Sequence, residues 1–430
     1  MLHSLKTKNI GPIAELELEF GDRLNIITGD NGLGKSFLLD VIWWALTKTW
    51  PAEVNPSLMS GFMARPTDPN AEAVIEYCYS GETEPIQHPS TFMRDEQKWA
   101  LRRGRPGIPG LVLYAQADGS FAVWDPARNY WFKKGEFEDV ERVPAFVFSK
   151  AEVFEGLEYR DKKVCKGLID DVSFWQSAKD TTNWELFSET LKKVSPSSGE
   201  QLAPGQLTSI DPLTSSMMPT IAMPYGQEVP VLHTSSGVKR ILSLAYLLAW
   251  AWIEHKRASQ VLGKAPTKSI ILLVDEVECH LHPKWQRTIL PSVMQTVYGL
   301  SELPEAAQVQ IIVTTHAPLV LASLETTFNA EKDQWFDFDA EGQHVELTPR
   351  DFVSYGSASN WLTSKAFDLK SDASLEREEL IEKLKAFLIR NDQTEEELQQ
   401  LEKELESVSF DLDPYWLDIR DLQREKGWKI

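Results

Sequence analysis

Four residues near the start of the chain have the types and the spacing of a phosphate-binding loop. Gly29, Gly34, Lys35 and Ser36 fit the pattern G-x-x-x-x-G-K-[ST] within the segment LNIITGDNGLGKSFLL. An apolar strand precedes the pattern and an apolar helix follows it, which is the context that this motif requires. Glycines let the backbone turn its N–H groups toward phosphate oxygens, and the helix N-terminus adds partial positive charge. The sequence therefore predicts a site for a nucleoside triphosphate.

Within this loop, two side chains have distinct predicted roles. We expect Lys35 to reach the β- and γ-phosphates and to assist catalysis, and we expect the Ser36 hydroxyl to hold Mg²⁺. ATP and Mg²⁺ are thus the cofactors that the loop implies. The full set of predicted nucleotide-binding residues is Gly29, Asp30, Asn31, Gly32, Gly34, Lys35, Ser36 and Phe37.

Two carboxylates end an apolar run in the second half of the chain. Asp275 and Glu276 follow SIILLV, a pattern typical of a buried parallel strand. Such a strand delivers the residues after it to the carboxyl edge of the sheet, where ligands bind in open α/β folds. We expect Asp275 to bind Mg²⁺ together with Ser36, and Glu276 to activate the attacking water as general base.

A histidine ends a second apolar run. His316 follows QVQIIVTT, which predicts another buried strand. Taken alone, a histidine in this place is more often a satisfied core or turn residue. Because it comes after a strand and behind two other phosphate motifs, we expect its side chain to touch the γ-phosphate. Whether Gln116 or the segment 148–152 adds a further contact to the metal is left open by the sequence.

The elements that position these residues alternate between strands and helices. Two antiparallel strands are expected within 5–20, followed by the strand 24–28 and a helix over 36–47. Short strands within 71–148, a helical stretch over 152–195 and a loop with a late hairpin over 195–230 come next. After the two buried strands, charged amphipathic helices are expected over 374–391, 395–407 and 414–427.

Composition limits the class of protein. The 430 residues are 42% hydrophobic and 25% charged, as in a soluble globular protein, and the three cysteines are isolated from one another. A formal net charge of −20 disfavours a protein that clamps DNA by itself. The longest apolar run, 241–253, is too short to span a bilayer, so we expect a cytoplasmic protein with no membrane partner.

Taken together, the motifs resemble those of the ABC-type ATPases of the SMC/RecF class. They are more similar still to the compact bacterial anti-phage ATPases related to the OLD, Septu and PARIS families. The resemblance rests on GDNGLGKS, on LLVDEVECHLHP and TTHAPLVLAS, and on TSSGVKR in the place of the ABC signature. It covers about residues 1–48 and 225–330, and departs from the transporter signature LSGGQ.

The resemblance implies a fold and a domain division. The fold class is α/β: an ABC-type P-loop ATPase head, with a mixed sheet and an antiparallel lobe, and a small helical C-terminal segment. The head is expected over 1–344, with 49–230 as antiparallel lobe and helical insertion, and the helical segment over 345–430. Whether these helices cap the head or dock a partner stays open. The chain shows neither a coiled-coil arm nor the D-x-D strand of a Toprim nuclease.

The family also implies an assembly. Two heads face each other, and each signature caps the nucleotide of the other head, so Ser235, Ser236 and Gly237 are expected to contact the γ-phosphate in trans. Glu276 becomes the general base and His316 the switch histidine. The chain is then expected to form a homodimer or a higher homo-oligomer.

The implied function is an ATPase that acts as sensor and scaffold in bacterial anti-phage defence. It would control a separately encoded effector, such as an HNH-type nuclease or another toxin. The alternative is a RecF-like DNA-repair ATPase that acts directly on DNA. That alternative predicts a basic groove and hydrolysis stimulated by DNA, and the charge of −20 counts against it.

Overall fold

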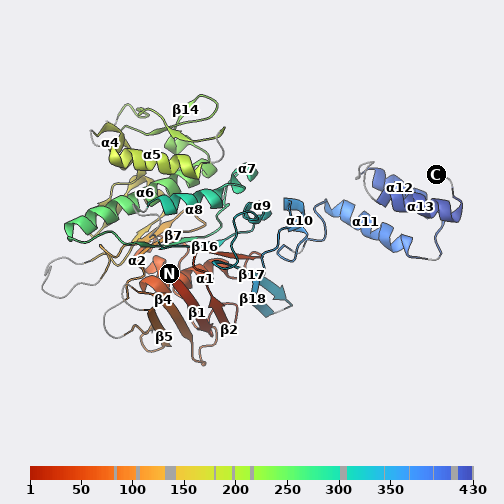
Figure 1. Cartoon of the computed structure of the whole chain (residues 1–430), viewed down its shortest axis with the longest axis horizontal. Coiled ribbons are helices and arrows are strands. Elements are labelled where there is room, and N and C mark those ends of the chain that lie inside the picture. The colour runs from red at the N-terminus through yellow and green to blue at the C-terminus, as the bar shows by residue number, and fades with distance from the viewer. Residues whose placement is uncertain are drawn as a thin grey trace. The chain divides into compact units, whose positions relative to one another are not determined.

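The computed structural model divides the chain into two compact units, Met1–Gly356 and Ser357–Ile430. Figure 1 labels the helices and strands of both units. Among the described residues, none of the helices combines the length and the apolar character needed to cross a bilayer. The structure describes residues 1–81, 85–102, 107–130, 142–178, 181–195, 199–213, 217–300, 308–342, 344–367, 369–390, 392–407 and 415–428.

A mixed sheet of eight strands runs through the first unit, in the order β18-β17-β3-β16-β15-β7-β8-β9. The five strands from β17 to β7 are parallel to their neighbours, and antiparallel strands extend the sheet at both ends. The parallel strands are covered on both faces, which explains their continuous apolar runs. Their bounds are β3 (Leu24–Gly29), β7 (Leu111–Ala115), β15 (Ser269–Val274), β16 (Gln308–Thr314) and β17 (Asp333–Glu341), with β8 (Phe121–Trp124), β9 (Phe146–Phe148) and β18 (His344–Arg350) outside them.

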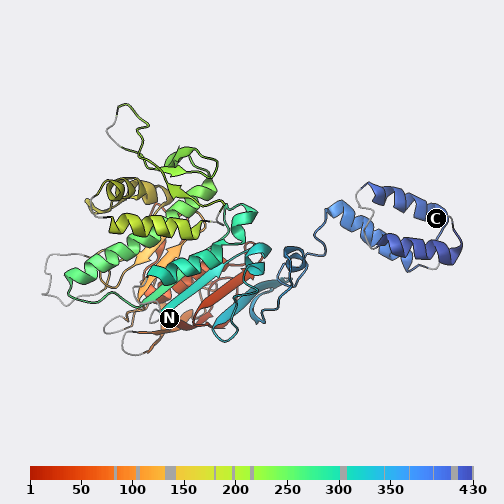
Figure 2. The same cartoon turned by 45° about the horizontal axis from the view of Figure 1, so that its top comes forward.

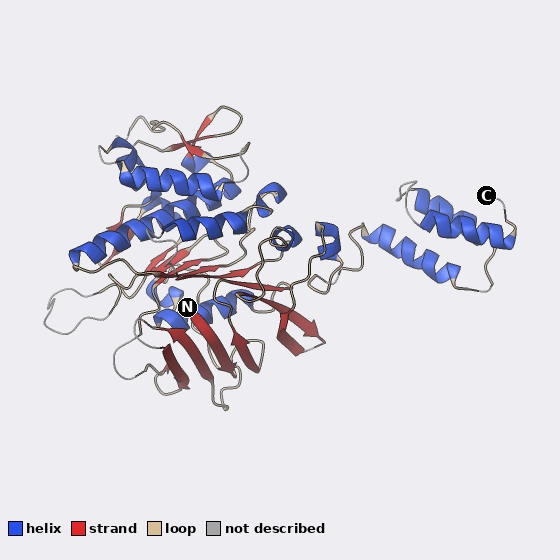
Figure 3. Cartoon of the chain, in the orientation of Figure 1, coloured by secondary structure: helices blue, strands red, loops and turns tan. Residues whose placement is uncertain are grey.

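A second, antiparallel sheet covers one face of the first. Its order is β2-β1-β4-β5-β6, and β4 alternates between buried and half-buried residues, as expected for a sheet with one face toward water. Helix α1 (Lys35–Thr47) lies between the two sheets and buries eleven of its residues there (Figure 3). The strands are β1 (Leu2–Lys8), β2 (Glu15–Glu19), β4 (Val74–Ser80), β5 (Pro85–Met93) and β6 (Lys98–Trp99), and the short α2 (Pro51–Val54) follows α1.

Helices cover the opposite face of the mixed sheet (Figure 2). The longest is α6 (Ser236–Val261), which is apolar on most sides and packs with α5 (Thr182–Val194) and α8 (Ile289–Leu300). Burial of this helix in the head accounts for the longest apolar run of the sequence, 241–253. Shorter elements beside these helices are α3 (Lys150–Glu155), α4 (Leu168–Ser177), β12 (Ala203–Pro204), β13 (Thr220–Ala222), β14 (Glu228–Pro230), α7 (Pro283–Gln286) and α9 (Pro318–Ala322).

The stretch 152–195, expected to be helical throughout, contains a hairpin. After α3 the chain turns at Gly156 and forms β10 (Leu157–Tyr159) and β11 (Lys162–Cys165) before α4 begins. Gly156 has a φ of +105°, and a Cβ there would lie 2.6 Å from the carbonyl oxygen of Cys165. The apolar spacing of this stretch is mixed, and mixed spacing does not separate a short hairpin from a helix.

The segment 49–230, expected to form an antiparallel lobe with a helical insertion, contributes strands to both large sheets and to two small ones, β10-β11 and β12-β13-β14. β4, β5 and β6 join the antiparallel sheet, whereas β7, β8 and β9 belong to the mixed sheet. The structure separates the two groups by burial: all five residues of β7 are buried, as in a strand covered on both faces.

The boundary expected at residue 345 also differs. Residues 344–350 form β18, paired antiparallel with β17, and the boundary between the two compact units follows Gly356 in the sequence. Val345 and Leu347 pack against the core of the first unit, so this strand continues the head.

Helices make up the regular structure of the second unit. After the short α10 (Ala358–Leu362), three longer helices pack around a separate apolar core, and Ser374 and Thr394 cap the first two by accepting backbone N–H bonds. They are α11 (Leu375–Leu388), α12 (Glu395–Glu406) and α13 (Tyr415–Lys426), and their core holds Leu384, Phe387, Leu398, Leu405, Ile419 and Leu422.

Candidate nucleotide site

The carboxyl ends of four neighbouring parallel strands bring the predicted phosphate and metal residues to one edge of the mixed sheet. The pairings Thr314 with Ile27, Val313 with Val274, and Val274 with Ala115 place these strand ends level with one another. β3 therefore leads into the glycine-rich loop beside the carboxylates after β15 and the histidine after β16.

The glycine-rich loop adopts a conformation that needs glycine. Gly29 has a φ of +126° and Gly34 a φ of +100°. A Cβ at Gly29 would lie 2.4 Å from the Cβ of Phe338, because β17 pairs with β3 at this residue. The loop thus turns tightly out of the sheet, and α1 begins at Lys35 directly after Gly34.

Lys35 is buried at the centre of the loop, whereas Ser36 is exposed beside it. The Lys35 ammonium donates to the carbonyl oxygens of Gly29, at 2.8 Å, and Asp30, at 2.6 Å. Burial lowers the pKa of Lys35, and the negative charges of Glu276 and other nearby carboxylates oppose this. The ammonium is therefore held at the loop among nearby carboxylates, where it can reach the phosphate oxygens of a bound nucleotide.

The other residues of the loop divide between exposed and packed positions. Asp30, Asn31 and Gly32 are exposed. Phe37 is half-buried, and its ring lies so close to the turn at Gly11 that a Cβ there would meet it at 2.4 Å. The side chain of Phe37 thus packs against the protein, and only its backbone N–H is suited to contact a phosphate.

Asp275 and Glu276 are fixed by a single threonine. The Thr314 hydroxyl donates to Oδ1 of Asp275 at 2.7 Å and accepts the backbone N–H of Glu276 at 2.8 Å. Glu276 has a φ of +47°, and its side chain is 36% exposed. Asp275 is buried and one of its carboxylate oxygens is hydrogen-bonded, which suits a metal ligand. Glu276 is accessible to solvent, which suits a general base that acts on water.

His316 lies against Glu276 and the glycine-rich loop. Its Nε2 is 3.7 Å from Oε1 of Glu276. Burial lowers the pKa of His316, the Lys35 charge lowers it further, and Glu276 acts in the opposite direction. A neutral imidazole here can donate one hydrogen bond to a γ-phosphate oxygen.

Gln116 is brought to this edge by β7, and the sequence had left its role open. It follows Ala115 directly, is 2% exposed, and its Oε1 accepts from the Ser120 hydroxyl while Nε2 has no hydrogen-bond partner among the described residues. The rival segment 148–152 instead begins α3, where Ser149 and Glu152 form a capping box. Gln116 follows the strand that pairs with β15, whereas β9 is separated from β15 by two strands. A contact of Gln116 to the metal stays a prediction, because its Oε1 is bound to Ser120.

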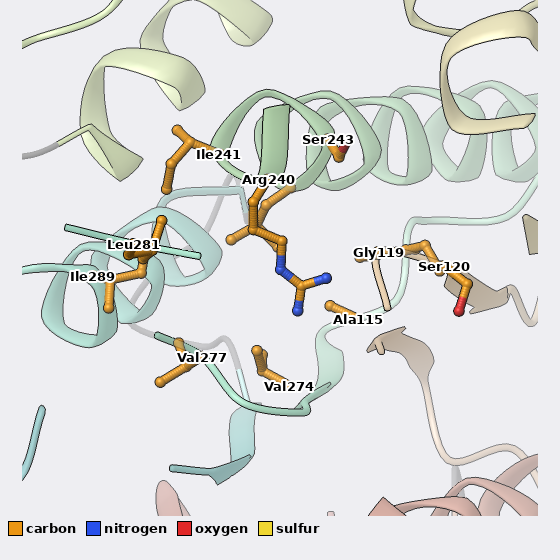
Figure 4. A pocket seen from close by; sticks show the side chains of 12 residues that line it. Ala115, Gly119, Ser120, Arg240, Ile241, Ser243, Val274, Val277, Leu281 and Ile289 are labelled. Atoms are coloured by element: carbon orange, nitrogen blue, oxygen red, sulfur yellow. The ribbon is translucent and has the colours of Figure 1, made fainter. Parts of the chain in front are cut away.

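Arg240, one turn into α6, joins the signature helix to this edge. Its guanidinium donates to the carbonyl oxygens of Gln116 and Asp275, the second at 3.2 Å. Figure 4 shows the side chain reaching from α6 toward Ala115 and Val274, at the ends of β7 and β15. Burial lowers the pKa of Arg240, and Cys279 and Asp275 oppose this.

The signature residues Ser235, Ser236 and Gly237 begin α6. Ser235 caps the helix by accepting the N–H of Val238, and both serines are exposed. Among the described residues, no hydrogen bond or ion pair joins these three to the glycine-rich loop. Gly237 instead packs on the segment after Glu276, since a Cβ there would lie 2.7 Å from the carbonyl oxygen of His280.

Gly237→Ala is therefore expected to destabilise the first unit by about 1–3 kcal/mol, because the added methyl group overlaps the His280 carbonyl. Unfolding by urea, followed by tryptophan fluorescence, measures this free energy. Gly199→Ala is the matched control, since nothing lies within 4 Å of a Cβ at that residue. Equal stability of the two variants would contradict the close contact.

Residues 24–322 match the family described as "AAA domain, putative AbiEii toxin, Type IV TA system", which is more than half of the chain. The chain belongs to this AAA-domain family. The matched range begins with β3 and ends with α9, so it includes the loop, both carboxylates, the signature and His316. The second unit lies outside the matched range.

Curated relatives agree with this assignment. The Septu protein PtuA of Bacillus thuringiensis is 22% identical over 323 residues, 74% of this chain and 72% of its own length. The Retron Vc95 probable ATPase of Vibrio cholerae is 29% identical over 125 residues, which are 27% of this chain but only 21% of that protein. The expected resemblance to compact ATPases of the Septu kind is confirmed.

Among solved structures, the chain is similar to an SMC head bound to the C-winged helix domain of ScpA. The match covers 81% of this chain and 98% of the SMC head chain, with 15% identity and a TM-score of 0.45. The AAA-domain family and the mixed sheet with its antiparallel partner confirm the α/β fold class of an ABC-type ATPase head.

The donor set at the edge fits Mg²⁺ with ATP. A serine hydroxyl and one carboxylate are hard oxygen ligands, and Mg²⁺ is commonly held by one or two carboxylates together with nucleotide phosphates and water. Ser36 and Asp275 would hold the ion, which would neutralise charge on the phosphates. The sequence did not identify Thr314 and Arg240 as residues of the site. Their only sequence signals are positions, a threonine shortly before His316 and an arginine one turn after the signature.

Proposed function

We propose that this chain binds ATP with Mg²⁺ at the carboxyl edge of the mixed sheet and hydrolyses it. Lys35 and the backbone of the loop hold the phosphates, and Ser36 and Asp275 hold the ion. Glu276 takes a proton from the attacking water, and His316 donates to the γ-phosphate. The observation that carries the proposal is the convergence of these side chains, from three parallel strand ends, on the buried Lys35.

The same proposal includes a dimer. The signature residues are exposed and packed against His280, and no described hydrogen bond links them to their own loop. An exposed helix N-terminus with two serines suits a phosphate presented by another chain. Two copies related by a twofold axis would then complete two nucleotide sites, each with a loop from one copy and a signature from the other.

We further propose that the ATP-dependent association and separation of the two copies acts as a switch in anti-phage defence. In the cytoplasm the dimer, or a larger homo-oligomer, would restrain or release a separately encoded effector, such as an HNH-type nuclease or another toxin. The likeness to the Septu protein over most of both chains supports this setting. The net charge of −20 counts against the RecF-like alternative, in which the chain would act directly on DNA.

The purified chain is expected to release phosphate from ATP and Mg²⁺, and Lys35→Ala is expected to lower this rate by about 10²-fold or more, because the ammonium acts on the transferred phosphoryl group. Steady-state phosphate release measures the effect. Lys332→Ala is the matched control, since that exposed lysine precedes β17 at the opposite edge of the sheet.

Turnover by Lys35→Ala at the wild-type rate would refute the site. Absence of turnover in the wild type, together with absence of ATP binding, would refute the proposed activity. Turnover that rises steeply on addition of DNA would favour the RecF-like alternative over an effector switch.

A further inference from the structure

A carboxylate with no role in the scheme above lies beside the switch histidine. Glu278, two residues after the general base, accepts the backbone N–H of His316 with Oε1 and the Thr315 hydroxyl with Oε2, the latter at 2.8 Å. Both oxygens are thus engaged by the two residues that follow β16. Burial raises the pKa of Glu278, and the hydrogen bond from the His316 backbone opposes this.

The chain places Glu278 there through the turn at Glu276. The positive φ of Glu276 bends the backbone over the end of β16, and the N–H of Val277 donates to the Thr314 carbonyl at 3.2 Å. Val277 is buried, and the N–H of Leu281 closes the turn on the Glu278 carbonyl at 2.9 Å. The direction of the Glu278 side chain is therefore set by its backbone.

The partners of Glu278 are fixed in turn to the strand that leads into the phosphate loop. The N–H of Thr315 donates to the Ile27 carbonyl at 3.1 Å, and its hydroxyl accepts the N–H of Ala317 at 3.1 Å. One carboxylate thus ties the segment of the general base to the segment of the histidine, and both to β3. These bonds leave the His316 ring 3.7 Å from Glu276.

We propose that Glu278 is a positioning residue for His316: it holds the backbone of 315–316 so that the imidazole faces Glu276 and the γ-phosphate. The inference rests on the proposed ATPase function and deepens it. Without the carboxylate, the His316 N–H and the Thr315 hydroxyl lose their acceptor, and the histidine is free to leave the site. In this role Glu278 acts on the nucleotide only through His316.

The test compares Glu278→Ala, Glu278→Gln, His316→Ala and the double variant Glu278→Ala/His316→Ala. Glu278→Ala is expected to lower kcat about 10-fold and to leave the KM for ATP within about twofold, as for a loss of transition-state contacts alone. Glu278→Gln should recover part of kcat, because its carbonyl oxygen can still accept the His316 N–H. Glu331→Gln, at an exposed glutamate before β17, should match the wild type.

The double variant distinguishes a role of Glu278 that acts through His316 from a general structural role. The double variant should be no slower than His316→Ala, since Glu278 acts only through that side chain. Multiplicative losses in the double variant, or a wild-type kcat in Glu278→Ala, would overturn the inference. Glu278→Gln in the His316→Ala background gives the same test if the alanine variant does not fold.

A second measurement separates this inference from the ATPase proposal. Hydrogen exchange at the His316 amide should be at least about 10-fold faster in Glu278→Ala than in the wild type, with or without turnover. Unchanged exchange would overturn the positioning role even if the chain hydrolyses ATP. Faster exchange in a chain with no turnover would uphold the contact and refute the ATPase proposal alone.

Discussion

Glu276→Gln is expected to lower ATP turnover by about 10²- to 10⁴-fold, the usual contribution of a general base, while ATP binding is retained. The substitution keeps the shape of the side chain and its distance of 3.7 Å from His316, but the amide cannot take a proton from water. Lys35, Ser36 and Asp275 are unchanged, so the nucleotide should bind as tightly as in the wild type. Single-turnover phosphate release and equilibrium binding of ATP measure the two effects separately.

The same variant should trap the assembly that precedes hydrolysis. With ATP and Mg²⁺, its mass by light scattering should be twice that of the single chain, whereas Lys35→Ala should remain a monomer under the same conditions. A monomeric Glu276→Gln chain with bound ATP would contradict trans completion of the site. Dimers without any nucleotide would instead indicate that another surface, such as the second unit, holds the copies together.

Most of the site could be predicted because its chemistry is local in sequence. The loop, Asp275 and His316 each come after a run of apolar residues, and parallel strands deliver the residues at their carboxyl ends to a common edge. The same reasoning gave α1 and the three amphipathic helices of the second unit. Where a motif is positioned by the residues next to it in the sequence, its residue types and their spacing are sufficient to predict its place in the site.

Contacts between distant segments could not be predicted in this way. Arg240 bonds Gln116 and Asp275, residues 124 and 35 positions away, and Glu278 bonds Thr315 across 37 positions. A single arginine or glutamate in a helix or turn carries no pattern that names its partner. The position of Gln116 depends likewise on β7 belonging to the mixed sheet. From the sequence, an apolar run of this length fits a strand of either sheet equally well.

The last of the expected results concerns which copy supplies which residue. Lys35→Ala removes the phosphate lysine, and Ser236→Arg places a bulky side chain at the exposed start of α6, where it should block the partner's nucleotide without disturbing the Ser235 cap. Each variant alone should be inactive. In an equal mixture, half of the dimers are mixed, and each of these has one site free of both substitutions. Turnover should then return to about a quarter of the wild-type rate, if the sites act independently.

The control for this mixture is Lys35→Ala with Glu276→Gln. Both residues serve the nucleotide held by their own chain, so every site in the mixed dimer carries one substitution or the other, and turnover should stay near zero. Recovery with Ser236→Arg but not with Glu276→Gln would place the signature in trans and the general base in cis. Recovery in neither mixture would mean that each chain completes its own site. The exposed serines would then have to reach the nucleotide of their own chain. This requires a movement of α6 that breaks the contact of Gly237 with His280. The same movement would displace Arg240 from the ends of β7 and β15.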